Sequence, residues 1–224
     1  MYQSALCYAA AVAIVFAGVP VAPTPRLAAR LAAHPGGLVV AADAGAATAR
    51  AFGLVPGVVV GDLDSIDAAT LADVRARGVP IEQYPRDKDA TDGELAVERA
   101  LGSGEGPLLL VGFLGGPRLD QAASNLLLLT RLPPGTVLLD ELNECRLLRS
   151  GETHAWQAEQ GEVVSLIPVG VDAQGVTTRG LRWPLQAATL VAGGSRGVSN
   201  EPSASRVEVA LGTGLLLVAR HFPT

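Results

Sequence analysis

The first part of the chain alternates short apolar runs with segments in which apolar residues recur every three or four positions. The apolar runs predict β-strands, and the segments between them predict helices. The expected strands are Ala11–Ala17, Leu38–Ala42, Val58–Val60, Val79–Gln83, Leu108–Phe113 and Thr136–Asp140. The expected helices are Pro25–Ala33, Ala46–Phe52, Ala68–Arg77, Asp92–Leu101 and Asp120–Thr130. This alternation predicts an N-terminal α/β domain with a mainly parallel sheet, in which ligands bind at the carboxyl ends of the strands.

The pattern changes from about Cys145 onward. Short apolar runs are separated there by Gly, Ser and Asn, and few stretches have a helical period. The runs are Glu162–Pro168, Gly175–Thr178, Arg206–Leu211 and Leu215–Arg220. This pattern is typical of a small antiparallel β-sandwich or barrel. We place the boundary near Leu142–Ser150, which gives an α/β domain over residues 1–145 and a C-terminal all-β sandwich over residues 146–224.

An almost unbroken apolar run from Ala5 to Ala22 has the length of a signal peptide or a membrane helix. A signal peptide needs a basic segment before its apolar part, but the first basic residue is Arg26. Gly18 and Pro20 also interrupt the run. A buried first β-strand is therefore favoured over a cleaved or inserted segment, and we expect no association with a membrane.

Composition narrows the class of protein further. The 224 residues carry 17 Lys and Arg against 22 Asp and Glu, a formal net charge of −5. Sequence-independent nucleic-acid binding needs a basic face, so we expect no nucleic-acid partner. Cys7 and Cys145 lie in no CxxC pattern and cannot form a disulfide framework, which favours the reducing cytoplasm.

Acidic side chains gather in two loops that follow predicted strands. The loop Gly61–Ser65 comes directly after Val58–Val60, and its two carboxylates, Asp62 and Asp64, have a spacing at which both can face one point. Two like charges at such a short distance repel each other unless a cation lies between them, and a set of oxygen ligands favours Mg²⁺. The alternative is a solvated turn in which Asp64 or Ser65 caps the next helix.

The second acidic loop spans Asp87–Glu94. Thr91 and Glu94 have the spacing of a capping box, which predicts a helix N-terminus there. The cap does not explain why Asp87, Asp89 and Asp92 cluster around Lys88. Acids that hold Mg²⁺ beside a lysine at a helix N-terminus would bind a metal–nucleotide complex.

Two further loops lie at the same predicted edge of the sheet. Gly112–Gln121 contains a glycine pair, which permits close approach of the backbone to a ligand. Arg118 could bind phosphate oxygens with its planar guanidinium. Asp120 could be a helix cap, a metal ligand or the partner that orients Arg118. Asp43 follows Leu38–Ala42, where it could simply cap a helix. If the acids of these loops converged with Lys88 and Arg118, they would form a metal–polyphosphate site.

Taken together, the motifs resemble the thiamine pyrophosphokinase family over nearly the whole chain after the first strand. They are ADAGA (42–46), GDLDS (61–65), KDATDGE (88–94), GGPRLDQ (115–121) with Asn125, GLRWPL (180–185) and VSNE (198–201). The resemblance implies ATP and Mg²⁺ as partners, and transfer of a pyrophosphoryl group to the hydroxyethyl oxygen of thiamine with release of AMP. It also implies a homodimer with the active site near the subunit interface.

The resemblance assigns roles to individual positions. It implies catalytic roles for Asp62, Asp64, Asp92 and Arg118, of which the three aspartates hold the metal. It implies nucleotide binding by Asp43, Gly45, Lys88, Asp89, Thr91, Asp120 and Asn125. It implies thiamine binding by Trp183, Ser199 and Asn200, although Trp183 could instead be a core residue like Trp156. The chain departs from the family at Ala44, Pro117 and Gln121, and Gln121 cannot act as a base near neutral pH.

Three other functions fit parts of the pattern. A pyrophosphokinase for another alcohol, such as a hydroxymethylpterin, would share the acidic loops. A non-catalytic thiamine or nucleotide sensor would tolerate Ala44 and Gln121. A glycosyltransferase with a DxD motif would leave the Lys88–Glu94 loop unexplained.

Overall fold

The computed structural model describes residues 12–34, 37–104 and 106–222. The chain divides into two compact units, one up to Gly112 and one from Phe113 on, and each is described by itself. The sequence-predicted boundary lies further along, near Leu142–Ser150, and stays a prediction.

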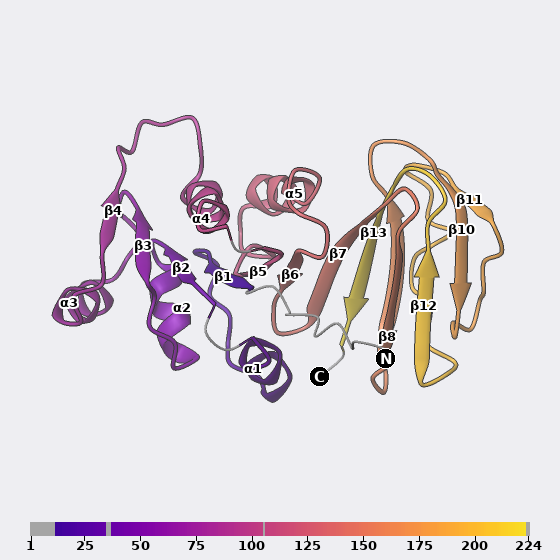
Figure 1. Ribbon diagram of the computed structural model, residues 1–224, viewed down its shortest axis with the longest axis horizontal. Helices are drawn as coiled ribbons and strands as arrows, with labels where there is room; N and C mark the ends of the chain where they lie inside the picture. The colour runs from indigo at the N-terminus through magenta and orange to yellow at the C-terminus, as the bar shows by residue number, and fades with distance from the viewer. Residues whose placement is uncertain (1–11, 35–36, 105, 223–224) are drawn as a thin grey trace, which may run out of the picture. The chain divides into compact units, whose positions relative to one another are not determined.

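The first unit is an open parallel sheet with helices (Figure 1). Its strands run in the order β4-β3-β2-β1-β5, and every strand pair in this unit is parallel. The strands are β1 (Ala13–Phe16), β2 (Val39–Ala42), β3 (Val58–Gly61), β4 (Ile81–Gln83) and β5 (Leu108–Val111). The helices are α1 (Pro25–Ala32), α2 (Gly45–Ala51), α3 (Ala68–Ala76) and α4 (Asp92–Leu101).

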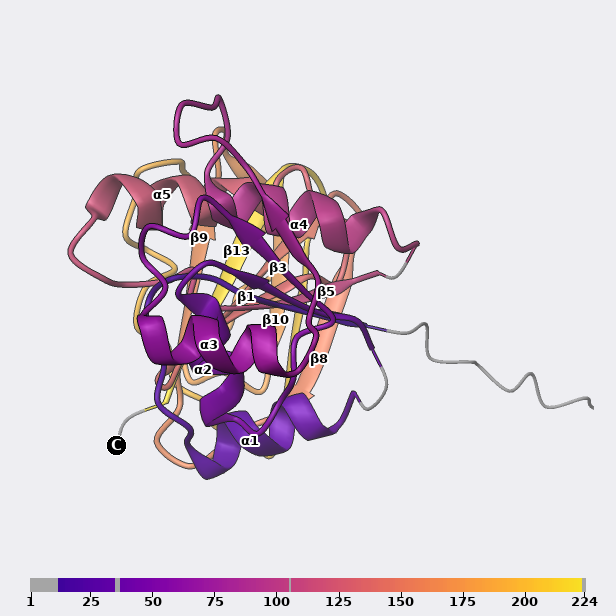
Figure 2. The same ribbon diagram turned by 90° about the vertical axis from the view of Figure 1, so that its left-hand side faces the viewer.

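Helices lie on both faces of this sheet, as the alternating pattern predicts. Helix α4 packs against β1, β2 and β3, and α2 packs against β1 and β2. Figure 2 shows α4 on one side of the strands and α2 on the other. Because both faces are covered, β1, β3 and β5 are apolar and buried along their whole length.

Side-chain caps determine where three of these helices begin. The Thr24 hydroxyl accepts a hydrogen bond from the Leu27 N–H, and Pro25 occupies the first turn of α1. Asp67 caps α3 by accepting from the Thr70 N–H. The predicted cap at Thr91 is confirmed, since its Oγ1 accepts from the Glu94 N–H at 3.1 Å and α4 begins at the next residue.

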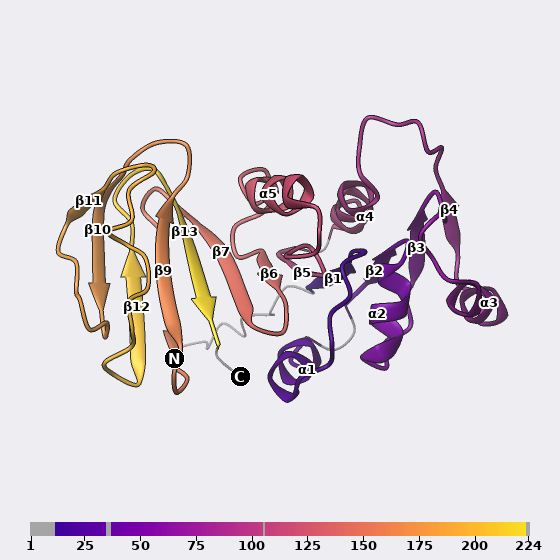
Figure 3. The ribbon, with the colours of Figure 1, turned by 180° about the vertical axis from the view of Figure 1, so that it is seen from behind.

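The second unit contains two antiparallel sheets, which appear as two layers in Figure 3. One layer has the order β6-β7-β13-β9 and the other β11-β10-β12-β8. The strands are β6 (Val137–Leu139), β7 (Asn143–Arg149), β8 (Thr153–Gln157), β9 (Val163–Pro168), β10 (Ala173–Arg179), β11 (Ala188–Leu190), β12 (Arg206–Ala210) and β13 (Leu215–His221). Helix α5 (Leu119–Leu128) precedes them in this unit.

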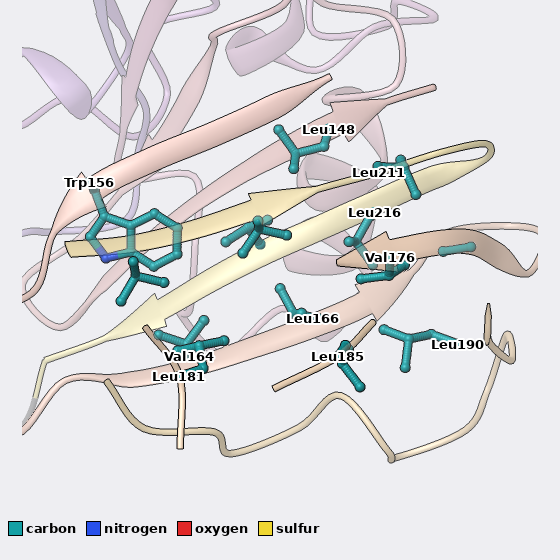
Figure 4. Packing of buried hydrophobic residues seen from close by; sticks show 14 residues of the cluster. Leu148, Trp156, Val164, Leu166, Val176, Leu181, Leu185, Leu190, Leu211 and Leu216 are labelled. Atoms are coloured by element: carbon teal, nitrogen blue, oxygen red, sulfur yellow. The ribbon is translucent and has the colours of Figure 1, made fainter. Parts of the chain in front are cut away.

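The core of the sandwich lies between these two layers. Residues from both sheets form one buried apolar cluster, and Figure 4 shows Trp156 at one end of it. Trp156 is buried, as predicted, and its Nε1 donates to Glu162 Oε1 at 2.9 Å. The buried Glu162 carboxylate also accepts two hydrogen bonds from Arg220, at 2.6 and 3.1 Å, so the charge in the sandwich is paired.

The fold class expected from the sequence is therefore confirmed: an α/β part with a parallel sheet, followed by an all-β sandwich. The first apolar run forms β1 at Ala13–Phe16, whereas its residues before Val12 lie outside the described part. Among the described residues, no helix combines the length and the apolar character needed to cross a bilayer. Strands β7, β8 and β11 were not predicted.

Candidate active site

Three aspartates from separate loops meet in the first unit. One carboxylate oxygen each of Asp43, Asp62 and Asp92 lies within 4.8 Å of the other two. Asp43 directly follows β2, Asp62 directly follows β3, and Asp92 is the first residue of α4. Because β2 and β3 are parallel neighbours, their carboxyl ends lie at the same edge of the sheet. We refer to these three residues as the acid cluster.

Gly61 lets the three acids approach each other. It lies at the end of β3 with φ 147°, a conformation that side-chain-bearing residues rarely adopt. A Cβ atom there would lie 3.1 Å from Asp92 Oδ1 and 3.3 Å from Asp43 Cβ. A side chain at position 61 would therefore push the acid cluster apart.

Asp43 is the buried member of the acid cluster. It is 4% exposed and has a left-handed φ of 47°, which aspartate tolerates better than most residues. Its Oδ2 accepts hydrogen bonds from Ser65, while its Oδ1 is buried and has no hydrogen-bond partner among the described residues. Burial raises the pKa of Asp43, and the nearby Asp92 and Asp62 carboxylates raise it further. The hydrogen bonds from Ser65 act in the opposite direction but do not cancel this rise.

Lys88 brings a positive charge to the acid cluster. Its Nζ lies 3.1 Å from Asp92 Oδ1 and 3.6 Å from Asp62 Oδ2, and it also donates to the Pro85 carbonyl. Burial alone would lower the pKa of Lys88, but the Asp92 and Asp62 carboxylates outweigh burial and raise it. The pKa of Asp62 lies below its usual value, mainly because the Asp64 backbone N–H donates to it and to a smaller extent because Lys88 is nearby. Lys88 and Asp62 therefore stay oppositely charged near neutral pH.

The acid cluster fits a divalent cation. It supplies three carboxylate oxygens at close range, and hard cations such as Mg²⁺ prefer oxygen ligands. The buried, unpartnered Asp43 Oδ1 is the stronger indication, because a buried polar atom without a partner costs free energy unless something binds it. We therefore regard Asp43, Asp62 and Asp92 as the residues that could hold Mg²⁺.

Asp64 lies next to the acid cluster but not within it. Its backbone N–H donates a hydrogen bond to Asp62 Oδ1 at 3.1 Å, and its exposed carboxylate lies 3.5 Å from the Arg86 guanidinium. The metal role assigned to Asp64 stays a prediction. The alternative that Asp64 or Ser65 caps the next helix is wrong, because Asp67 caps α3.

Other predicted nucleotide-binding residues of this unit have structural roles or remain open. Asp89 is exposed and outside the acid cluster, and its nucleotide-binding role stays a prediction. Thr91 caps α4. A Cβ on Gly45 would lie 2.2 Å from the Phe16 carbonyl oxygen, so close packing against β1 explains the glycine. Asp43 does not cap α2, whose N-cap residue is Ala44.

Arg118, Asp120 and Asn125 belong to the second unit. Arg118 Nε donates to Asp120 Oδ1 at 2.9 Å, which makes Asp120 the partner that orients the guanidinium. This hydrogen bond lowers the pKa of the exposed Asp120 to about 2. Asn125 donates to the Phe113 carbonyl at 2.8 Å and so holds the start of the glycine loop. Gly115 and Gly116 both have positive φ values, which explains the glycine pair.

Trp183 is 52% exposed, so the alternative that it is a core residue is wrong. The Arg182 guanidinium lies 4.8 Å from the centre of its ring and also pairs with Glu201 at 3.0 Å. One face of the indole therefore already has a cation over it.

Asn200 holds the backbone of Trp183 from both sides. Its Oδ1 accepts from the Trp183 N–H at 3.2 Å, and its Nδ2 donates to the Trp183 carbonyl at 2.8 Å. Asn200 is 8% exposed. Ser199, its neighbour, is exposed with φ 60°, and its N–H donates to Ser165 Oγ. The substrate-binding roles of Ser199 and Asn200 stay predictions, and for Asn200 the structure shows an orienting role.

Sequence reasoning missed three contributors to these sites. Ser65 was considered as a cap and not as a partner of Asp43, Gly61 was not singled out, and Arg182 was not connected with Trp183. The GDLDS motif does contain Gly61 and Ser65, so their position beside the acids was a usable signal. The pairing of Ser65 with a residue 22 positions away could not be seen in the sequence.

The architecture is that of an α/β unit that carries the acid cluster, followed in the chain by a β-sandwich. Residues 32–137 match the family model "Thiamin pyrophosphokinase, catalytic domain", and residues 153–216 match "Thiamin pyrophosphokinase, vitamin B1 binding domain". The two matches share no residues and together span most of the chain. The chain belongs to the thiamine pyrophosphokinase family.

Individual relatives agree with this assignment. Thiamine pyrophosphokinase of Bacillus subtilis (strain 168) is 27% identical over 186 residues, which cover 82% of this chain and 86% of the relative. Thiamine pyrophosphokinase 1 of Oryza sativa subsp. japonica is 30% identical over 72% of this chain and 64% of its own length. The solved structure of the Bacillus subtilis enzyme superposes with a TM-score of 0.82 at 25% identity, over 95% of this chain and 99% of that one.

Proposed function

We propose that this protein transfers the pyrophosphoryl group of ATP to the hydroxyl of thiamine, which yields thiamine diphosphate and AMP. The acid cluster with Lys88 carries the proposal, because it lies in the part of the chain that matches the catalytic domain of the family. Similar proteins over most of the chain are named thiamine pyrophosphokinases. Those names favour thiamine over a pterin alcohol and an enzyme over a sensor.

The acid cluster would hold the magnesium ion of the nucleotide. We assign Asp43, Asp62 and Asp92 as its ligands, with Asp64 close by as a further acid. When bound, Mg²⁺ neutralises charge on the phosphate oxygens, which is the main requirement of phosphoryl-type transfer. Lys88 Nζ, now 3.1 Å from Asp92 Oδ1, would donate to an outer phosphate oxygen. A carboxylate oxygen of Asp92 would accept the proton of the thiamine hydroxyl.

Other charged groups would orient the nucleotide. Arg118 would bind phosphate oxygens with its guanidinium fork, and Asp120 would keep that fork in position. Asp89, Thr91 and Asn125 would make further contacts with the nucleotide. These roles are supported by the match of the motifs to the family.

Trp183 would bind the aromatic, cationic rings of thiamine. Its indole is half exposed, and the Arg182 guanidinium covers one face, so the substrate would stack on the other face. Ser199 would contribute polar contacts beside it. We further propose that the protein is a homodimer in the cytoplasm, which rests on the family resemblance and on the cysteine content.

Release of AMP with different acceptors tests the function. The purified chain should form AMP from ATP only when thiamine and Mg²⁺ are both present, and excess EDTA should abolish the reaction. Asp62→Asn should lower kcat by at least about 100-fold with the fold unchanged by circular dichroism, because one metal ligand loses its negative charge. Formation of AMP with a hydroxymethylpterin and none with thiamine would contradict the proposal.

A further inference from the structure

Ser65 makes a double contact with the buried acid of the cluster. Its Oγ donates to Asp43 Oδ2 at 2.7 Å, and its backbone N–H reaches the same oxygen at 3.3 Å. The two residues are 22 positions apart and lie in the loops that follow β3 and β2. The Asp43 backbone N–H donates to the Val60 carbonyl at 2.9 Å. Asp43 is therefore held by the β3 segment at both its backbone and its side chain.

This contact decides which carboxylate oxygen is available to a ligand. Oδ2 receives both hydrogen bonds from Ser65, whereas Oδ1 is buried and has no hydrogen-bond partner among the described residues. The carboxylate of an aspartate can rotate about its terminal torsion, which is broad when nothing holds it. The two donors of Ser65 remove this freedom, while Oδ1 keeps its capacity to accept.

We propose that Ser65 is a positioning residue, which orients Asp43 so that Oδ1 faces a divalent cation in the acid cluster. The inference rests on the proposed function only in taking this cluster as its magnesium site. Groups that orient metal ligands through hydrogen bonds typically change metal affinity about 10- to 100-fold when they are removed. Ser65 would act through Asp43 and would not itself contact the cation.

The local structure separates this role from simple folding. Asp67 caps α3, so the helix does not need the Ser65 hydroxyl. Ser65 is exposed and packs little apolar surface. Loss of its hydroxyl should therefore affect the orientation of Asp43 much more than the stability of the chain.

Binding of Mn²⁺ alone to the full-length protein, followed by electron paramagnetic resonance, tests the inference. Ser65→Ala should weaken the Kd for Mn²⁺ by about 10-fold or more, because Asp43 is no longer held. Ser65→Thr, which keeps the hydroxyl, should stay within about 3-fold of wild type. Ser103→Ala is the matched control: its hydroxyl donates to the Ala100 carbonyl at the far end of α4, and its loss should leave the Kd unchanged. Thermal unfolding in EDTA checks that each variant is folded, and Ser65→Cys replaces Ser65→Ala if the latter does not fold.

Steady-state kinetics separates the two proposals. Ser65→Ala should raise the Mg²⁺ concentration for half-maximal activity by a similar factor and leave the KM for thiamine within about 2-fold. Equal Mn²⁺ binding by Ser65→Ala and wild type, or no Mn²⁺ binding by wild type, would overturn the positioning role. Weakened Mn²⁺ binding in a protein that forms no AMP with thiamine would support the positioning role and reject the proposed function.

Discussion

Replacing Asp43 with asparagine should make the metal-free protein more stable. Asp43 is buried, and the Asp92 carboxylate lies within 4.8 Å of it. At that distance two like unit charges repel by about 3.5 kcal/mol at an effective dielectric constant of about 20. Lys88 and water offset part of this repulsion, so we expect a net gain of about 1–2 kcal/mol, or about 4 °C in Tm.

Asparagine fits the position without new strain. It tolerates the left-handed φ of 47°, its carbonyl can still accept from Ser65, and its amide can donate to the neighbouring carboxylates. The gain should depend on pH. Because the pKa of Asp43 is raised in the folded protein, its charged form destabilises the fold above that pKa. The advantage of the asparagine variant should therefore disappear as the pH falls below about 3.9, the ordinary pKa of aspartate.

Thermal unfolding with EDTA and with Mg²⁺ measures both effects. Wild type should gain stability from Mg²⁺, whereas Asp43→Asn should gain much less because one ligand has lost its charge. Asp73→Asn is the control, since it removes a partly exposed aspartate that pairs with Arg77 at 2.8 Å on α3, and it should change stability by less than about 0.5 kcal/mol. The reasoning fails if Asp43→Asn is less stable than wild type in EDTA at neutral pH.

Three more predictions concern the second unit. Glu162→Gln should cost about 2 kcal/mol in urea unfolding, because the buried Arg220 loses its nearest counter-charge and keeps only Glu144 at 3.6 Å and Glu159 at 4.0 Å. An unchanged midpoint would contradict this. Trp183→Ala should raise the KM for thiamine more than the KM for ATP, and equal effects on both would remove the stacking role. Burial raises the pKa of Cys145 to about 12, so only about one thiol in ten thousand is ionised at pH 8. In a Cys7→Ser background, Cys145 should resist Ellman's reagent until the protein unfolds, and rapid labelling of the native protein would show the thiol to be accessible.

The periodic pattern of the first unit was sufficient to locate its elements. Helix α4 has the bounds expected from the pattern, because Thr91 caps it and its apolar residues recur at helical spacing. Strands β7 and β8 were missed because polar residues interrupt them: in β8 only Trp156 is buried, and in β7 Glu144 is buried and ion-paired with Arg146. Such strands are stabilised by pairing with distant strands, which a local pattern does not show.

The acid cluster was predicted in part. The sequence correctly brought Asp62, Asp92 and Lys88 together, because Asp62 follows a strand, Asp92 begins a helix, and Lys88 lies in the loop that leads into that helix. It gave Asp64 a metal-binding role from the GDLDS motif and gave Asp43 a nucleotide-binding role, whereas the structure places Asp43 in the acid cluster. Leu63 has φ 67°, and in this turn the Asp64 N–H faces Asp62 while its carboxylate pairs with Arg86. The contact between Asp43 and Ser65 depends on the pairing of β2 with β3 and needed the structure.

The fate of the β-phosphate of ATP tests the central claim most directly. The protein is incubated with thiamine, Mg²⁺ and ATP that is isotopically labelled at its β-phosphate, and the products are separated by chromatography. We predict that the label moves into thiamine diphosphate and that the AMP formed carries none. Label that remains in ADP, or ATP cleavage that does not depend on thiamine, would contradict the claim.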